Sequence, residues 1–313
     1  MKSPIFIFSM PRSGSTLLQK ILTTHPKIKT HNETWLMLPL AYWHDKKEVQ
    51  SIFGFNSFKL ALNDVIESLP NKEVTYNEIV RDFYNSIYTK LGASGEVYFL
   101  DKTPRYYFII DFINKVYPDA KFIFLTRDPR EIYASYITSF RDNSIYRFDE
   151  FDRDFNNGYN LLLQGYNKYK SKSLHISYED LINNTSTELE IISKYLEINF
   201  NNFNIEDAFN ESQLGHMGDK KIRDTNKILT NKDNWKNVLN SYPRKVLLVN
   251  MINNIDDDYF KIFLSQRKDK VIKDIKSHYI NPNLKDLANM VEIYFVRFVK
   301  YILRKTIHYK DYY

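Results

Sequence analysis

Short apolar runs alternate with helical patterns in the first part of the chain. Residues 5–8 are continuously apolar, which is typical of a strand buried on both faces of a parallel sheet. A polar loop follows at residues 9–15, and His25-Pro26 ends the helix that comes after it. The apolar face of that helix consists of Leu17, Leu18, Ile21 and Leu22. The chain therefore opens with a strand, a loop and a helix.

The same alternation recurs along the chain. Further strands are expected at residues 97–100, 122–125 and 174–176, and helices at 129–140 and 185–196. Residues 101–104 are expected to start a helix, because Pro104 suits a first turn. Strands alternating with helices predict an α/β fold whose mostly parallel sheet carries helices on both faces.

Beyond Pro243 the strand signals fade. Residues 246–255 and 287–304 have helical patterns, with a polar, lysine-rich stretch around 265–276 between them. We therefore expect an α/β domain over residues 1–250 and a helical C-terminal extension over residues 251–313, packed on or beside it.

The composition of the chain limits which ligands and reactive groups it can use. The 44 lysines and arginines against 38 acidic residues give a net charge of +6, which mildly favours an anionic ligand; no nucleic-acid partner is expected. The chain has no cysteine, which excludes disulfides, thiolate nucleophiles and cysteine-bound metals. The N-terminus lacks a signal-peptide core and no long apolar stretch occurs, so a cytoplasmic protein is expected.

The loop after the first strand, residues 9–16, has the composition of an anion site. Backbone N–H groups and a helix N-terminus converge in such a loop, and Gly14 permits the tight backbone path. Arg12 adds a cation, and hydroxyl donors come from Ser13, Ser15 and Thr16. The nucleotide-triphosphatase loop would need an earlier glycine and a lysine, and both are missing. An ordinary serine-rich helix cap is the simpler alternative.

Residues 11–17 resemble the 5′-phosphosulfate loop of the sulfotransferases that use 3′-phosphoadenosine 5′-phosphosulfate (PAPS). That loop has the form Pro-(Arg/Lys)-Ser-Gly-(Ser/Thr)-Thr-Leu, and this chain matches it at every position. The resemblance implies a P-loop-like fold and PAPS as co-substrate. It also implies that the nucleotide is held by Arg12, Ser13, Gly14, Ser15, Thr16 and Leu17. Apart from His31, the histidines show no close metal-ligand spacing, so no metal is expected.

Three later segments also resemble this family. Arg127 ends a strand and Ser135 follows eight positions later, as in the family's 3′-phosphate site; a salt bridge from Arg127 to Asp128 or Glu131 is the alternative. Tyr178 lies in a Tyr-Glu-Asp-Leu segment, and in the family the tyrosine of this segment lies near the adenine base of the nucleotide. A tyrosine buried in the core is nearly as good an interpretation. In residues 215–223, the resemblance implies that Gly218 and Arg223 close over the 3′-phosphate, unless this is a solvated loop.

The resemblance also suggests the acid–base groups. Glu33 has the position of the glutamate base in the protein-tyrosine and bacterial glycolipid sulfotransferases, and Lys102 has that of a lysine supporting the leaving group. Arg12 and Lys102 are therefore expected to stabilise charge, with Glu33 as general base. His31 is a rival base. The cytosolic small-molecule sulfotransferases use a histidine near the segment of Lys102, where this chain has none.

The expected reaction moves a sulfuryl group to a hydroxyl or amine of a small molecule, glycan or lipid precursor. Residues 35–52 and 140–155 are expected to shape a partly apolar acceptor pocket. The rivals are a P-loop-like nucleotide kinase or NTPase, and a non-catalytic protein that binds a nucleotide or a membrane surface.

The last predicted helix carries an apolar stripe among basic residues. It could dock on the domain, form a homodimer or make a weak membrane-surface contact. The stripe consists of Leu287, Met290, Val291, Tyr294, Phe295, Phe298, Tyr301 and Ile302.

Overall fold

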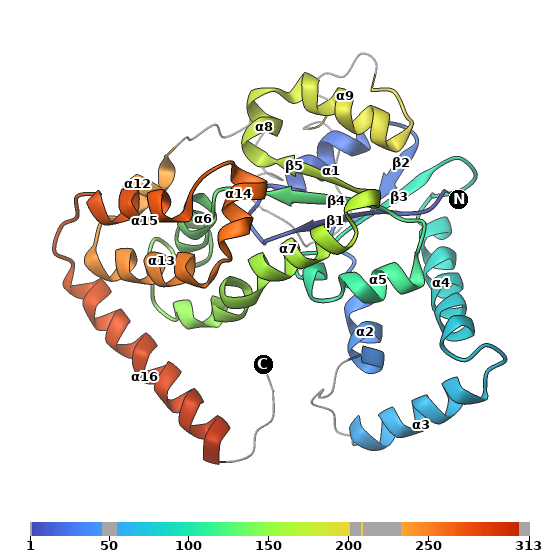
Figure 1. Cartoon of the computed structure of the whole chain (residues 1–313), viewed down its shortest axis with the longest axis horizontal. Coiled ribbons are helices and arrows are strands. Elements are labelled where there is room, and N and C mark those ends of the chain that lie inside the picture. The colour runs from blue at the N-terminus through green and yellow to red at the C-terminus, as the bar shows by residue number, and fades with distance from the viewer. Residues whose placement is uncertain (1, 46–54, 201–207, 209–232, 307–313) are drawn as a thin grey trace.

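The computed structural model describes residues 2–45, 55–200, 208 and 233–306. Its centre is one five-stranded sheet in the order β2-β3-β1-β4-β5, in which every neighbouring pair is parallel (Figure 1). The strands are β1 (Ile5–Ser9), β2 (Ile28–Thr30), β3 (Tyr98–Lys102), β4 (Lys121–Thr126) and β5 (Ser173–Ser177). The chain leaves β1 toward one edge of the sheet and returns to pair β4 on its other side. Such a switch point opens a crevice at the carboxyl ends of the strands.

Helices cover both faces of the sheet. One face carries α1 (Ser15–Thr23), α8 (Tyr178–Asn183) and α9 (Thr185–Leu196). The opposite face carries α4 (Glu73–Lys90), α5 (Ile110–Val116), α6 (Pro129–Phe140), α7 (Tyr159–Lys168), α13 (Tyr242–Asn254) and α14 (Asp257–Leu264). The remaining helices are α2 (Met37–Asp45), α3 (Phe55–Ser68), α12 (Asn234–Val238), α15 (Lys268–Ser277) and α16 (Leu284–Thr306). Short turns are η1 (Tyr106–Phe108), η2 (Phe148–Phe151), η3 (Asp154–Gly158) and η4 (Lys170–Lys172).

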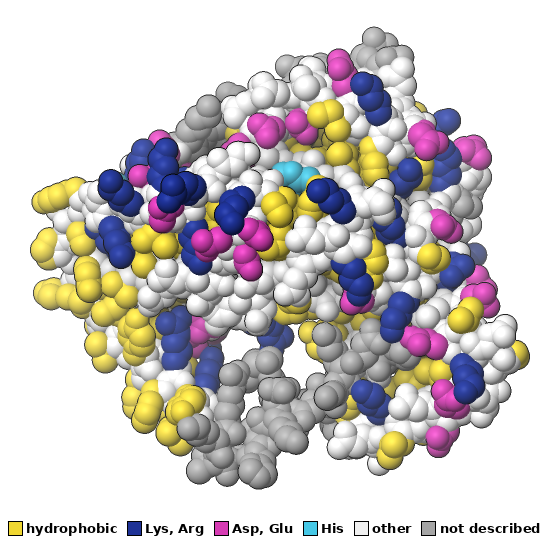
Figure 2. Space-filling view, in the orientation of Figure 1, with side chains coloured by type: hydrophobic (Ala, Val, Ile, Leu, Met, Phe, Trp, Pro, Cys, Tyr) yellow, Lys and Arg dark blue, Asp and Glu magenta, His cyan; other side chains and the backbone are white. Residues whose placement is uncertain are grey.

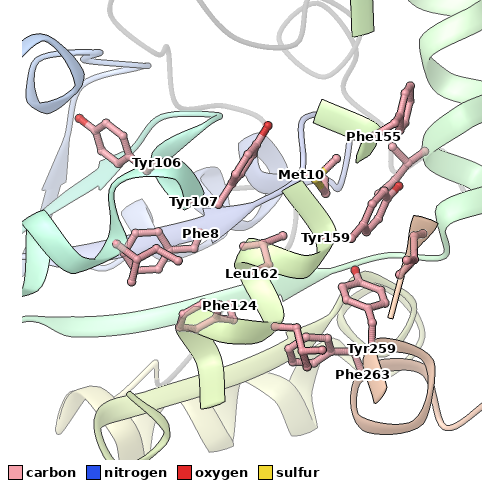
Figure 3. Packing of buried hydrophobic residues seen from close by; sticks show 14 of the residues in the cluster. Phe8, Met10, Tyr106, Tyr107, Phe124, Phe155, Tyr159, Leu162, Tyr259 and Phe263 are labelled. Atoms are coloured by element: carbon pink, nitrogen blue, oxygen red, sulfur yellow. The ribbon is translucent and has the colours of Figure 1, made fainter. Parts of the chain in front are cut away.

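The two faces of the sheet have different side chains. Because side chains alternate along a strand, Phe6 and Phe8 point to one face while Ile5 and Ile7 point to the other. The same division in β4 produces an aromatic core on one side, where the rings of Phe8 and Phe122 meet edge to face at 5.0 Å. Figure 3 shows this aromatic side, with Phe8 and Phe124 beneath α7. The sheet is thus buried on both faces, as a parallel sheet requires.

The expected α/β architecture is confirmed, and one local prediction is wrong. Asp101 and Lys102 belong to β3 rather than to the start of a helix: Asp101 pairs with Phe6 in the sheet, and α5 begins only at Ile110. A carboxylate is tolerated inside this strand because three side-chain hydroxyls donate hydrogen bonds to it. The sequence pattern also missed α2, α3 and α4, and the lysine-rich stretch contains α15.

The C-terminal helices pack on the aromatic side of the sheet. Residues on both sides of position 250, such as Phe124 and Tyr259, belong to one hydrophobic cluster. The division of the chain into two units at that position stays a prediction. Within the described part of the chain, no helix has both the length and the apolar character needed to span a bilayer.

Candidate active site

The loop between β1 and α1 has a tightly curved backbone. Arg12 and Gly14 both have positive φ values, 71° and 92°. The Ser13 N–H donates to the Met10 carbonyl at 3.2 Å, which closes the turn. A Cβ on Gly14 would collide with the ring of Tyr178, so glycine is required both for the backbone angle and for the close approach of that ring. The side chains of Ser13, Ser15 and Thr16 are buried at the start of α1.

Two of the arginines that the sequence singled out, Arg12 and Arg127, are in contact. Arg127 Nη1 donates to the carbonyl oxygen of Arg12 at 3.1 Å. Arg12 in turn donates to Ser135 Oγ at 2.9 Å and to Ser139 Oγ at 3.1 Å, both on α6. The contact follows from topology, because β1 and β4 are neighbours with Ser9 paired to Leu125, so the loops after them start side by side. The structure therefore brings Arg12, Arg127 and Ser135 together.

Tyr178 joins the same cluster. The Arg127 guanidinium lies 4.4 Å from the centre of the Tyr178 ring, at a distance typical of a cation–π contact. Asp128 pairs with Arg130 at 2.6 Å and caps α6, while Glu131 lies 3.8 Å from Arg127. Sequence reasoning had left both acids open as partners of Arg127, and the structure pairs it with Glu131.

The loop presents buried donors that fit an anion. Within the described residues, Ser13 Oγ and Arg127 Nε are buried and have no hydrogen-bond partner. Buried polar atoms in native proteins are nearly always paired, so an unpaired donor requires an explanation. The oxygens of a phosphate or sulfate group would satisfy both, and the N-terminus of α1 adds to the favourable potential.

A second cluster lies at the ends of β1 and β3. Lys102 Nζ is 3.0 Å from Glu33 Oε1 and 3.5 Å from Thr16 Oγ1. The Lys102 side chain is 1% exposed and that of Glu33 is 9% exposed, so the ion pair is nearly buried. Trp35 Nε1 donates to the other oxygen of Glu33 at 3.2 Å. Lys102 thus connects the predicted general base, Glu33, to the loop of residues 9–16, which we call the anion loop.

Asp101 is a residue that sequence reasoning did not select. It is fully buried, and it accepts hydrogen bonds from Thr34 Oγ1 (2.8 Å), Tyr88 OH (2.6 Å) and Tyr106 OH (3.1 Å). Burial raises the pKa of Asp101, and it raises the pKa values of Tyr88 and Tyr106 well above the usual range. Thr34 follows Glu33 in the sequence, and Asp101 precedes Lys102. The hydrogen bonds to Asp101 therefore hold the segment of Glu33 against the segment of Lys102. The sequence feature that could have pointed to Asp101 is an acidic residue directly after the apolar run of residues 97–100.

The other predicted site residues are placed as follows. Leu17 is 2% exposed and packs in the aliphatic core behind the loop. The backbone carbonyl of His31 accepts a hydrogen bond from Gln19 Nε2 at 3.0 Å. Gly218 and Arg223 lie outside the described residues.

A groove opens near this edge of the sheet. Arg105, three residues after Lys102, makes a bidentate pair with the buried carboxylate of Asp154, which also accepts from Tyr107. Arg105 lines a groove of about 950 Å³ whose walls come from η2, η3, α13 and α16. The lining mixes ion-paired side chains and asparagines with apolar residues such as Phe155 and Met251.

Comparison with known proteins assigns the class. Residues 4–202 match the model of the sulfotransferase family. The chain therefore belongs to the sulfotransferase family, whose members are transferases that move a sulfuryl group.

Individual relatives match over shorter stretches. The nodulation protein NoeE of Sinorhizobium fredii is 34% identical over 131 residues, which are 42% of this chain and 30% of that protein. A putative protein-tyrosine sulfotransferase of Caenorhabditis briggsae is 24% identical over 201 residues, 63% of this chain and 66% of that protein. The chain thus spans between about a third and two thirds of the length of these relatives.

Among solved structures, a mouse sulfotransferase complexed with PAP is similar over 88% of each chain, with 15% identity and a TM-score of 0.48. This similarity is too low to assign details, and the fold stands on the sheet topology described above.

Proposed function

We propose that this chain transfers a sulfuryl group from PAPS to a hydroxyl or amine of a small molecule, glycan or lipid precursor. Glu33 acts as general base, and Lys102 and Arg12 stabilise the charge that develops. The observation that carries the proposal is the position of Lys102, which contacts both Glu33 and Thr16 of the anion loop.

The loop cluster would hold the nucleotide. Ser13, Ser15, Thr16 and the backbone around Gly14 would bind the 5′-phosphosulfate through hydroxyl and N–H donors. Arg127 and Ser135 would bind the 3′-phosphate, and Tyr178 would contact the adenine from its place beside Arg127. The buried, unpaired donors on Ser13 and Arg127 support this assignment.

The reaction breaks the S–O bond to the nucleotide and forms an S–O bond to a hydroxyl acceptor or an S–N bond to an amine acceptor. When bound, PAPS supplies an activated sulfuryl group whose bond to the bridging phosphate oxygen breaks as the bond to the acceptor forms. Glu33 takes the acceptor's proton, and Lys102 donates a hydrogen bond to the bridging oxygen as negative charge accumulates there. Because the pair is nearly buried, the electrostatic effect of Lys102 is stronger than it would be in water.

The groove beside Arg105 is the proposed acceptor site. Arg105, which lines the groove, lies three residues after Lys102 in the sequence. The wall also includes residues between 147 and 157, which overlap the acceptor segment expected at residues 140–155. Its mixed polar and apolar lining suits an acceptor that has hydroxyl groups and some apolar surface.

Transfer of labelled sulfate from PAPS tests this function. The purified chain is incubated with PAPS and panels of small-molecule, glycan and lipid-precursor acceptors, with and without EDTA. Labelled product that still forms in EDTA and disappears in Glu33→Gln supports the proposal. Phosphoryl transfer from ATP that requires magnesium would contradict it.

A further inference from the structure

Helix α16 has two unlike sides, and the side that packs against the protein combines charged residues with the buried side chain of Ile293 and the partly buried Met290. Asp286 is 2% exposed and accepts hydrogen bonds from Arg244 Nε (2.8 Å) and Ser241 Oγ (2.7 Å). Further along, Arg297 pairs with Asp152 and Lys300 with Asp149, both near η2. These charged contacts and the burial of Ile293 attach the helix to the body, and most of the apolar stripe takes no part in that attachment.

The apolar side of α16 faces outward. Six residues recur at alternating intervals of three and four positions: Leu284, Leu287, Val291, Tyr294, Phe298 and Tyr301. All six are exposed, with Val291 at 68% and Phe298 at 60%, and Phe295 and Ile302 widen the stripe. Figure 2 shows hydrophobic side chains along the lower-left edge of the molecule, where Figure 1 places α16. An ordinary surface helix has the opposite orientation.

The stripe is large enough to be an interface. Taking about 200 Å² for a fully exposed large side chain, the eight residues expose on the order of 800 Å². The largest apolar patch on a typical monomer is about 300–600 Å², and each partner in a stable complex buries about 800 Å². A patch of this size is expected to be covered in the working protein.

We propose that the outer side of α16 is covered by α16 of a second copy of this chain, so that the protein is a dimer built on a two-helix contact. The alternating spacing of three and four is the pattern of a coiled-coil seam, and it is sustained for five intervals. The helix has 23 residues, about 34 Å at 1.5 Å per residue, which is long enough for such a seam.

Charge favours a second copy over a lipid surface. A helix that lies on a membrane usually presents a basic rim to anionic headgroups. In the part of α16 whose side chains are described, Arg297 and Lys300 are bound to aspartates on the inner side. Lys285 and Glu292 are the remaining charges there besides the buried Asp286, and they cancel. Over the part of α16 whose side chains are described, the stripe therefore offers apolar surface without a basic rim.

The dimer would also affect the groove. The inner side of α16 contributes Val296, Arg297 and Lys300 to the groove wall, and Tyr301, at the margin of the stripe, also lines it. A partner on the outer side would add contacts that hold this helix, and with it the groove wall, in place. The proposal for the dimer does not depend on the proposed reaction, since the oligomeric state is measured without substrate.

Sedimentation velocity at micromolar concentration tests the contact. The wild type is expected to sediment as a dimer of twice 37.5 kDa, and Val291→Glu/Phe298→Glu as a 37.5 kDa monomer. Ile79→Glu, at another exposed apolar position, is the matched control and should remain dimeric. A monomeric wild type overturns the proposal, as does a dimer that persists in the double variant. Co-sedimentation of a monomeric wild type with phosphatidylserine vesicles, lost in the double variant, would assign the stripe to lipid instead.

A cross-link gives a second readout that does not depend on destabilising the helix. The chain has no cysteine, so Tyr294→Cys places a single thiol near the middle of the stripe. In a helix pair around a twofold axis, this position lies close to its own copy in either orientation. Mild oxidation should give a covalent dimer with Tyr294→Cys and none with Ile79→Cys. Absence of the Tyr294→Cys cross-link, or equal cross-linking at Ile79→Cys, contradicts the helix pair.

Discussion

Lys102 Nζ lies 3.0 Å from Glu33 Oε1, and both side chains are nearly excluded from solvent. The two residues are 69 positions apart in sequence, and they meet because β3 ends beside the segment that follows β2. The hydroxyl of Thr16 lies within 3.5 Å of the same ammonium group. The proposed base, the proposed electrophile and the anion loop are therefore mutually positioned by the sheet.

Glu33→Gln should abolish transfer while the fold and nucleotide binding remain. The amide keeps the shape, and its single oxygen can replace the carboxylate oxygen that accepts from Lys102 or the one that accepts from Trp35, but not both. It cannot take a proton, so we expect the rate to fall by about 100- to 10,000-fold. Turnover with saturating PAPS measures the rate, and the thermal shift with adenosine 3′,5′-bisphosphate measures binding. His31→Asn is the matched control for the rival base. Turnover that survives in Glu33→Gln and disappears in His31→Asn would move the base to His31.

Lys102→Met should reduce both activity and stability. It leaves the Glu33 carboxylate nearly buried without its cation, so we expect a loss of about 3 kcal/mol in the free energy of unfolding. In Lys102→Met/Glu33→Gln no carboxylate remains to be paired, and most of that stability should return. Urea unfolding of the two single variants and the double variant gives the coupling energy. Additive losses would mean that the two side chains are not coupled in solution.

Gly14→Ala should weaken nucleotide binding through both the backbone and the Tyr178 ring. The residue has φ of 92°, and the new Cβ would collide with that ring. The matched control is Gly95→Ala, where φ is also positive (56°) but the Cβ would meet no described atom within 4 Å. We expect about 1–2 kcal/mol of destabilisation in Gly95→Ala with unchanged nucleotide affinity. Equal affinity in the two variants would show that the loop does not need this backbone path.

His175 should make the protein less stable in mild acid. Burial lowers the pKa of His175 to about 4, and its Nε2 is 2.8 Å from Thr126 Oγ1, next to Arg127. Between pH 6.5 and pH 4 the unfolded chain binds a proton that the folded chain does not, so the free energy of unfolding falls as the pH falls through this window. We expect His175→Gln, which keeps a polar contact to Thr126, to reduce that fall by about 2 kcal/mol. Parallel pH profiles of the two proteins, measured by urea unfolding, would contradict this expectation.

Local patterns predicted most of the sheet and the position of the anion loop. The apolar runs of β1 and β4 and the stripe of α6 are short-range signals. Arg127 directly follows β4, and Gly14 lies in the loop between β1 and α1. The sequence also predicts that the loops of Gly14 and Arg127 lie close together, because the carboxyl ends of parallel strands share one edge of the sheet. The strand order and the hydrogen bond from Arg127 to the Arg12 carbonyl required the structure.

The parts that were missed depend on long-range contacts. The residues next to Asp101 suggest the start of a helix. Its place in a strand depends on hydroxyl donors that include Thr34 and Tyr88, which lie 67 and 13 positions away, and Tyr88 belongs to a helix that the pattern did not reveal. The outward orientation of α16 was likewise not visible in its periodicity, because a stripe shows that one side is apolar but not which side meets the body. Contacts with distant parts of the chain decide that, among them the ion pairs with Asp149 and Asp152, about 150 residues away in sequence, and the burial of Ile293 in the core.

The most direct test of the central claim is calorimetric titration of the protein with adenosine 3′,5′-bisphosphate, compared with ATP and magnesium. We predict that the wild type binds the bisphosphate and that Arg127→Ala weakens this binding by at least about tenfold, the loss of one charge-assisted contact. ATP with magnesium should bind more weakly than the bisphosphate. Tight binding of ATP with magnesium and no binding of the bisphosphate would contradict the assignment of Arg12, Arg127 and Ser135 to one nucleotide site.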